Sequence, residues 1–298
     1  MPKSNERNEI AAGQKQFIET IVEIMKKAVV YGSDENKKVI QQQYEQEELK
    51  PAKFQLGVIL EDFEIARKKQ VPLCQDTGAP VFYIKLGNEV RLNFDLKQAL
   101  AEAVRQATER VPLRRNVVHP VSRQNTNDNT GMGFPYTFFD YFEGDYVEVL
   151  YYPKGGGSEN MSKLKMFNSV STLDEIKQFI IETAAEFMGK CCSPYTLGVG
   201  IGGGADICMN IAKKATLRDP GVSNKDPQIA KMEKELQERI NSLGIGPMGL
   251  GGEKSLITVN IEVVGTHPST YPVGIANNCW PGRKSCVRFY QDGRIKHC

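Results

Sequence analysis

The sequence has no long apolar run and almost no net charge, and each absence excludes a class of protein. No stretch approaches the roughly 20 consecutive apolar residues that a membrane-spanning helix needs, so no membrane partner is predicted. The 38 Lys and Arg residues are nearly balanced by 36 Asp and Glu residues, which gives a formal net charge of +2. A charge this small does not favour nucleic acid as a partner.

The sequence also lacks the cysteine spacing of a disulfide framework or a zinc site. Its seven cysteines are an odd number scattered through 298 residues, and none forms a C-x-x-C pair. This pattern favours a reducing compartment, where cysteines more often serve metals or catalysis. Residues 1–16 mix acidic and basic side chains and contain no apolar segment typical of a signal peptide. We therefore expect a cytoplasmic protein.

The order of the apolar patterns predicts a mixed α/β fold. Apolar residues recur at helical spacing from Phe17 to Val29 and stop before Gly32, and two further helical patterns bring the helical N-terminal part to about residue 70. A mixed sheet flanked by helices is predicted to follow. No repeat, low-complexity tract or clear linker is visible, so residues 1–298 are predicted to form a single domain.

Local signals place several elements within that fold. Residues 80–86 read as a buried strand, and two β-rich runs, 136–142 and 146–152, surround Glu143-Gly144-Asp145 and predict a hairpin. Thr172 begins a capping box that opens a helix running to about Met188. Asp226 and Pro227 begin another helix, which Gly244 is predicted to end.

One loop concentrates chemically useful side chains. Residues 74–77 supply a thiol, an amide, a carboxylate and a hydroxyl in succession, and they lie between Pro72 and Gly78. Proline restricts the backbone and glycine permits positive φ, so a rigid loop is predicted, and loops of this kind often carry function. The alternative is a polar turn that contains one buried cysteine.

Two glycine-rich segments and one polar loop are less specific. Residues 155–157 are three consecutive glycines, which would allow backbone N–H groups to converge on a phosphate or a carboxylate. Gly198, Gly200 and Gly203 match G-x-G-x-x-G, but the acidic residue of a dinucleotide site is absent, and close approach of a strand and a helix explains these glycines equally well. The polar loop 125–131 by itself indicates no function.

Three of the cysteines share a setting that suits an iron–sulfur cluster. Cys74, Cys192 and Cys279 each lie in a loop beside an apolar run and next to proline, glycine or asparagine. Three thiolates from separate loops could hold a [4Fe–4S] cluster and leave one iron open to a substrate hydroxyl and carboxylate. The alternative is that all three are buried structural cysteines.

The motifs around these cysteines resemble those of class I iron–sulfur hydro-lyases. The similar segments are CQDTG at 74–78, KGGGSENMS at 154–162, CSPYTLGVGIGG at 192–203, LGIGPMGLGG at 243–252, HPST at 267–270 and CW at 279–280. The chain is most similar to the α subunit of two-subunit class I fumarate hydratase or L(+)-tartrate dehydratase. The resemblance covers about residues 57–283.

The resemblance implies a role for particular positions. It implies Cys74, Cys192 and Cys279 as cluster ligands, Gln75, Asp76, Arg114, Gly155, Gly156 and Gly157 as substrate contacts, and Asp76 and His267 as catalytic residues. Cys191, Cys208, Cys286 and Cys298 match no ligand position. The family usually has Cys-Pro-Pro at the second ligand, whereas this chain has Cys192-Ser193-Pro194 after Cys191, so Cys191 stays an alternative to Cys192.

The resemblance also implies a reaction and a partner. We expect reversible hydration of fumarate to L-malate, with a β subunit supplying the remaining active-site residues in an α2β2 assembly. L(+)-tartrate dehydration is the alternative reaction, because the segment 158–162 is more like fumarase whereas 267–270 and 279–280 are more like tartrate dehydratase. An electron-transfer or iron-sensing protein would also use a cluster, but would normally have a fourth cysteine at matching spacing.

Overall fold

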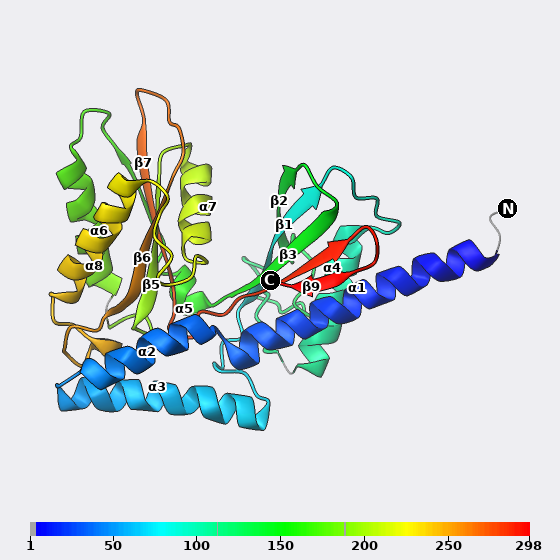
Figure 1. The fold of residues 1–298 in the computed structure, drawn as a ribbon, viewed down its shortest axis with the longest axis horizontal. Helices are drawn as coiled ribbons and strands as arrows, with labels where there is room; N and C mark the ends of the chain where they lie inside the picture. The colour runs from blue at the N-terminus through cyan, green and yellow to red at the C-terminus, as the bar shows by residue number, and fades with distance from the viewer. Residues whose placement is uncertain (1–3, 112, 188) are drawn as a thin grey trace. The chain divides into compact units, whose positions relative to one another are not determined.

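The chain folds into two compact units that are each built from separated stretches of sequence (Figure 1). A computed structural model describes residues 4–111, 113–187 and 189–298. Unit 1 contains Met1–Gly32, Ala66–Gly155 and Arg283–Cys298, and unit 2 contains Ser33–Ile65 and Gly156–Gly282. The mixed α/β class is confirmed, and the single domain predicted for residues 1–298 stays a prediction.

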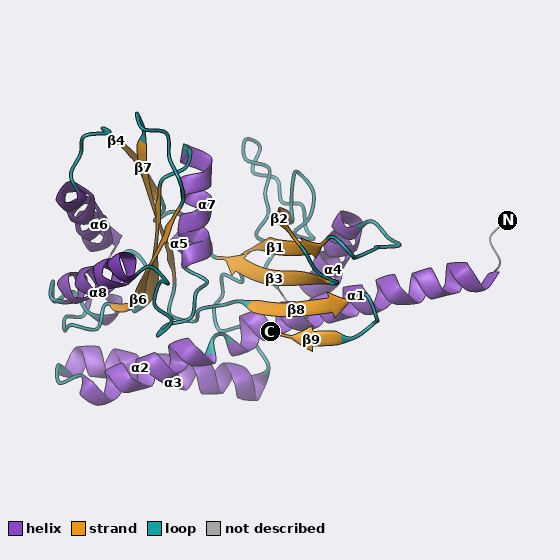
Figure 2. Ribbon diagram, turned by 45° about the horizontal axis from the view of Figure 1, so that its top comes forward, coloured by secondary structure: helices purple, strands orange, loops and turns teal. Residues whose placement is uncertain are grey.

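Unit 1 is a five-stranded sheet with helices on one face. Its elements are α1 (Ser4–Tyr31), β1 (Ala79–Gly87), α4 (Leu96–Arg110), β2 (Tyr136–Phe142), β3 (Tyr146–Lys154), β8 (Ser285–Tyr290) and β9 (Ile295–His297). Alternate residues of β1 and β3 share one buried apolar core with α1 and α4 (Figure 2). The apolar stripe predicted from Phe17 to Val29 lies in this core, and α1 ends before Gly32, whose φ is 61°.

The hairpin predicted for 136–142 and 146–152 is wrong, because β1 lies between its two strands. The strand order is β2-β1-β3-β8-β9; β2 pairs with β1 in parallel, and β3 pairs with β1 in antiparallel orientation. The connection at Gly144 passes the end of β1, where the Glu89 backbone N–H donates to the Gly144 carbonyl (3.0 Å). β1 is buried for most of its length, so its backbone N–H and C=O groups need partners within the protein. The strands β2 and β3 on its two sides supply these hydrogen bonds.

Unit 2 is a four-stranded sheet covered on both faces. Its elements are α2 (Asp34–Gln46), most of α3 (Lys50–Lys69), α5 (Gly156–Glu159), β4 (Lys163–Phe167), α6 (Leu173–Phe187), β5 (Tyr195–Ile201), α7 (Ala205–Ala215), α8 (Pro227–Asn241), the 3-10 helix η1 (Pro247–Gly249), β6 (Leu256–Val263) and β7 (Tyr271–Asn278). The strand order is β4-β7-β5-β6, and β5 and β6 are parallel. Figure 1 shows α7 on one face of this sheet and α6 and α8 on the other.

Two helix signals in unit 2 are confirmed by their hydrogen bonds. The Thr172 hydroxyl accepts from the Glu175 backbone N–H (3.3 Å), and the Glu175 carboxylate accepts from the Thr172 N–H (2.6 Å), which is a capping box. The Asp226 side chain caps α8 through the Gln228 N–H (2.8 Å). The predicted end of the first of these helices at Met188 falls outside the described residues.

Two glycines of the G-x-G-x-x-G match allow close packing of α7 against β5. Gly198 and Gly200 lie inside β5 rather than in the turn after it. A Cβ atom on Gly198 would lie 2.2 Å from the Ala212 carbonyl oxygen of α7, and one on Gly200 would lie 2.2 Å from that of Cys208. Only glycine therefore allows α7 to approach β5 this closely, which favours the packing interpretation over a dinucleotide site.

Replacing Gly198 by alanine should destabilise the protein by about 3 kcal/mol, because the backbone of α7 must move to admit the methyl group. The measurement is urea denaturation followed by circular dichroism. Gly265→Ala is the control, since a Cβ atom there meets nothing within 4 Å and its backbone needs no positive φ. Equal midpoints for the two variants would contradict the proposed role of Gly198.

Candidate active site

Several of the predicted site residues of unit 1 gather at one end of its sheet, where the inner strands β1 and β3 begin and end, respectively. The loop that carries Asp76 precedes β1, and Gly155 follows β3; Ala79 of β1 pairs with Lys154 of β3, so the loop and Gly155 meet at that end. Ser285 of β8 pairs with Tyr151 of β3, which brings the chain just before β8 to the same end. We call this group of residues the unit 1 site.

Asp76 is held in place by hydrogen bonds from three directions. Its carboxylate Oδ1 accepts from the Gly78 backbone N–H (3.0 Å) and from Asn116 Nδ2 (3.1 Å). Its backbone carbonyl accepts from Arg283 Nη1 (2.6 Å), and Arg283 is only 7% exposed. Gly78 has φ of 84°, as the rigid-loop prediction required. The Asp76 side chain is therefore half-buried in a fixed orientation.

Gly155 lies in a confined space but has no unusual backbone conformation. A Cβ atom on it would lie 3.2 Å from Arg283 Nη2 and 3.3 Å from Asp76 Oδ2. Gly155, Gly156 and Gly157 are not among the described glycines with positive φ. Gly156 and Gly157 are exposed and begin the single turn α5, where the Gly156 carbonyl accepts from the Asn160 N–H (2.9 Å). Gly155 thus lies close to the side chains of Arg283 and Asp76, and Gly156 and Gly157 begin a helical turn.

Arg114 lies beside the Asp76 loop. The Arg114 backbone N–H donates to the Thr77 hydroxyl (2.9 Å), and its carbonyl accepts from Asn129 Nδ2 (3.1 Å), while its side chain is exposed. Gln75 is also exposed, and its Oε1 accepts from the Cys74 thiol (3.5 Å). A fixed backbone with an exposed guanidinium suits Arg114 to binding a carboxylate.

The three predicted ligand cysteines are divided between the two units. Cys192 precedes β5 and Cys279 follows β7. Because Thr196 pairs with Asn278, both cysteines lie at the same end of the unit 2 sheet. The Trp280 backbone N–H donates to the Cys192 carbonyl (3.4 Å), so their loops are in contact. Cys74 belongs to unit 1. The meeting of all three at one cluster stays a prediction.

Burial distinguishes the predicted ligands from other cysteines. Cys192 is exposed, and Cys74 and Cys279 are half-buried, so each of these residues keeps part of its surface accessible. Cys191, by contrast, is 6% exposed and lies in the apolar core of unit 2. Burial raises the pKa of the Cys208 thiol to about 11, which disfavours the thiolate that binds metals. The three accessible cysteines fit a thiolate-bound cluster.

A second cysteine group does not fit that cluster. Glu148, Cys286 and Cys298 place possible ligand atoms within 4.8 Å of one another among the described residues. Cys286 and Cys298, however, form a disulfide, which the expectation of reduced cysteines did not include. Burial raises the pKa of Glu148, but hydrogen bonds from Lys85 and Arg288 outweigh it and lower that pKa. The bonded sulfurs and paired carboxylate leave no thiolate for iron.

His267 lies far from Cys279 within unit 2. Its imidazole is exposed, and Nδ1 accepts from the Ser269 N–H (3.1 Å), so the neutral ring carries its proton on Nε2. His267 precedes β7 and Cys279 follows it, and the eight residues of β7 span roughly 26 Å. A site that combined His267 with Cys279 of the same chain would have to bridge this distance, and the role predicted for His267 stays a prediction.

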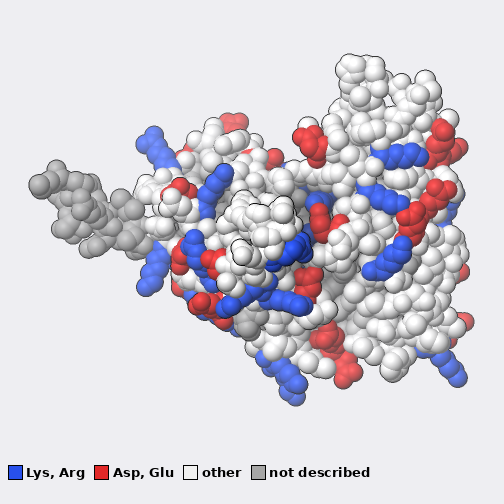
Figure 3. Space-filling view, turned by 180° about the vertical axis from the view of Figure 1, so that it is seen from behind, with Lys and Arg blue, Asp and Glu red and all other residues white. Residues whose placement is uncertain are grey.

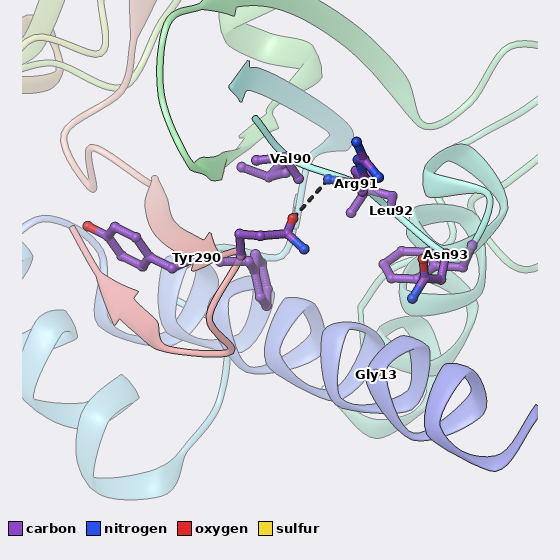
Figure 4. A pocket seen from close by; sticks show the side chains of 10 residues that line it. Gly13, Val90, Arg91, Leu92, Asn93 and Tyr290 are labelled. Atoms are coloured by element: carbon purple, nitrogen blue, oxygen red, sulfur yellow. Dashed lines mark hydrogen bonds between the residues drawn. The ribbon is translucent and has the colours of Figure 1, made fainter. Parts of the chain in front are cut away.

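A small pocket elsewhere in unit 1 contains none of the predicted residues (Figure 4). It has a volume of about 210 Å³ and is lined by Gly13, Val90, Arg91, Leu92, Asn93, Phe94, Val147, Phe289, Tyr290 and Gln291. The Arg91 backbone N–H donates to Gln291 Oε1 at its wall (2.8 Å). The lining has no carboxylate, thiol or imidazole, so it offers none of the side chains that most often bind metal ions.

Charges of both signs are mixed on one face of the molecule (Figure 3). On the face drawn in Figure 3, Lys and Arg side chains lie among Asp and Glu side chains, and no field of one sign stands out. Among the helices that the structure describes, none combines the length and the apolar character needed to cross a bilayer.

The structure adds three residues that sequence reasoning missed. Asn116, Asn129 and Arg283 all bond to the segments that carry Asp76 and Arg114. Asn129 belongs to the polar loop 125–131, which by itself indicated no function, yet this residue is only 2% exposed. The dense run of Asn and Asp in that loop was the available signal, since these side chains readily bond to backbone groups.

Comparison with known proteins identifies the family. The profile of the fumarate hydratase (Fumerase) family matches residues 18–288. A Methanocaldococcus jannaschii protein, provisionally named as an L(+)-tartrate dehydratase α subunit, is 42% identical over 281 residues, which cover 93% of this chain and 99% of that protein. L(+)-tartrate dehydratase α subunits of Escherichia coli strains UTI89 and K12 are 35% and 34% identical over 222 residues, covering 74% of this chain and 73% of each. The chain therefore belongs to the fumarate hydratase (Fumerase) family of hydro-lyase enzymes, as its motifs indicated.

Proposed function

We propose that this chain is the α subunit of a [4Fe–4S]-dependent hydro-lyase that interconverts fumarate and L-malate. The observation that carries the proposal is the unit 1 site, where a fixed carboxylate, Asp76, lies in the same loop as a half-buried cysteine, Cys74. Membership of a hydro-lyase family supports the reaction class.

Cys74, Cys192 and Cys279 are the proposed cluster ligands. The family profile spans residues 18–288 and so covers all three cysteines, which supports this assignment. When bound, a cluster with three protein ligands supplies an iron that acts as a Lewis acid toward a substrate hydroxyl. Cys192 is preferred over Cys191 because it is the exposed member of the pair.

The remaining residues of this chain bind the substrate and handle a proton. Arg114 pairs with one carboxylate of the dicarboxylate, and Gln75 and residues 155–157 contribute polar contacts to it. Asp76 acts at the hydroxyl side, where a fixed carboxylate can accept or return the proton. The role of His267 stays a prediction of the family resemblance, because the length of β7 separates it from Cys279 within one chain.

A β subunit is proposed to complete the site in an α2β2 assembly. The relatives described above are named as α subunits, which supports the existence of a partner chain. The residue that removes the proton from the substrate carbon is assigned to that partner.

L(+)-tartrate dehydration is the second candidate, and the names of these same relatives favour it. Fumarate remains our first choice because residues 158–162 resemble fumarase and the matching profile is that of fumarate hydratase. Both reactions would use the same contacts to a four-carbon dicarboxylate.

One experiment tests the partner and the substrate together. The cluster-loaded chain alone, and the same chain reconstituted with its β subunit, are assayed anaerobically with L-malate, fumarate and L-tartrate. We expect turnover only in the complex and a higher kcat/KM for malate and fumarate. Turnover by the chain alone would refute the need for a partner, and a large preference for tartrate would refute the choice of substrate.

A further inference from the structure

The buried amide of Asn129 joins three segments of unit 1. Its Oδ1 accepts from the Asn116 backbone N–H (2.7 Å), and its Nδ2 donates to the Arg114 carbonyl (3.1 Å) and to the Thr108 hydroxyl (3.1 Å). Asn129 is only 2% exposed and has φ of 62°, a conformation that asparagine tolerates better than most residues. One side chain thus fixes the backbone on both sides of Arg115.

The same backbone segment carries the contacts to Asp76. Asn116, whose N–H is held by Asn129, uses its own Nδ2 to donate to Asp76 Oδ1 (3.1 Å) and to the Gly78 carbonyl (3.3 Å). The Arg114 N–H donates to the Thr77 hydroxyl (2.9 Å), and Thr77 is buried. A continuous set of hydrogen bonds therefore runs from Asn129 to the Asp76 carboxylate.

We infer that Asn129 is a positioning residue that sets the distance and orientation between Asp76 and Arg114. This inference rests on the proposed function, in which these two side chains contact the same substrate. Asp76 and Arg114 come from segments about 40 positions apart, and each has a hydrogen-bond partner on the other's segment. Fixed spacing between a carboxylate-binding group and a proton-handling group is what a rigid dicarboxylate requires.

The amide of Asn129 is suited to this task because it both donates and accepts. Aspartate at 129 would keep an acceptor for the Asn116 N–H but lose the donor to the Arg114 carbonyl. Glycine at 129 would lose all three side-chain hydrogen bonds while still allowing positive φ. Asn127 provides a matched control: it lies in the same loop with φ of 68°, and its side chain is exposed.

The test compares Asn129→Gly with Asn127→Gly by amide hydrogen exchange on the single chain and by kinetics of the αβ complex. For Asn129→Gly we expect exchange of the Asn116 amide at least about tenfold faster, and kcat/KM lower by about 10- to 100-fold. Asn127→Gly should change neither quantity. Asn129→Asp should keep the Asn116 amide protected and still lower kcat/KM, which provides a readout if the glycine variant does not fold.

Two outcomes would overturn the inference. Unchanged exchange at Asn116 in Asn129→Gly would show that the hydrogen bond does not hold this segment. Faster exchange with kinetics equal to those of Asn127→Gly would assign Asn129 a purely structural role. Failure of the proposed function is distinguishable, because then Asp76→Asn and Arg114→Met would also leave turnover unchanged whatever the exchange rates.

Discussion

Replacing Cys192 by serine should leave the chain folded but reduce its iron and sulfide content to near that of the cluster-free protein. A serine hydroxyl is a much poorer ligand than a thiolate for the iron of such a cluster. Cys192 is exposed, so the substitution removes little buried packing and should hardly change the unfolding midpoint. The measurement is anaerobic iron and sulfide analysis after reconstitution, and Cys74→Ser and Cys279→Ser should behave in the same way.

Cys191→Ser is the matched control for this prediction, because it makes the same chemical change one residue away. Cys191 lies in the apolar core of unit 2, so serine there should cost about 1–3 kcal/mol of stability by burying a hydroxyl. Its iron content should nevertheless stay at the unmodified level. Iron lost from Cys191→Ser and kept in Cys192→Ser would reverse our assignment of the ligand.

Replacing Asp76 by asparagine should lower kcat of the reconstituted αβ complex by about 10²- to 10⁴-fold, the range expected when a proton-transfer group is removed. The side-chain oxygen of asparagine can still accept from the Gly78 N–H and from Asn116 Nδ2, so the loop should keep its geometry. Stability and iron content should therefore remain close to those of the unmodified chain, and both are measured alongside the steady-state kinetics.

Asp95→Asn makes the same change at a site with no proposed role in catalysis. The Asp95 side chain caps α4 by accepting from the Gln98 N–H (3.0 Å), and asparagine is an equally good N-cap. Its kcat should stay within a factor of about two. If Asp76→Asn retained comparable turnover, the proton-handling role assigned to Asp76 would be wrong.

Local sequence signals succeeded where the structure depends on neighbouring residues. The capping box at Thr172, the N-cap at Asp226 and the end of α1 before Gly32 all have the predicted positions, because each is formed within a few residues. The hairpin at Gly144 failed for the opposite reason. Its two strands have the predicted bounds within a few residues, but β1, distant in the sequence, supplies the hydrogen-bond partner of each.

The candidate site shows the same difference between residues that local sequence reveals and residues that only distant contacts reveal. Cys74, Gln75 and Asp76 stand out because an unusual set of functional groups is adjacent in the sequence, and the family motifs add Arg114 and the glycines. Asn129 and Arg283 do not stand out, since their contacts to residues 114 and 76 come from loops that meet only when the sheet of unit 1 forms. The structure also shows that the length of β7 separates His267 from Cys279, although only eleven residues lie between them in the sequence.

By itself, the sequence determined the mixed α/β class, the family and the chemical groups available to it, because composition, periodicity and adjacent motifs are local properties of the chain. Only the tertiary structure decided which strands are neighbours, which cysteines are accessible, and which polar side chains hold Asp76 and Arg114 in place. Strand pairing and burial depend on residues that are far apart in the sequence, and a local pattern contains no information about which distant segment will satisfy its hydrogen bonds.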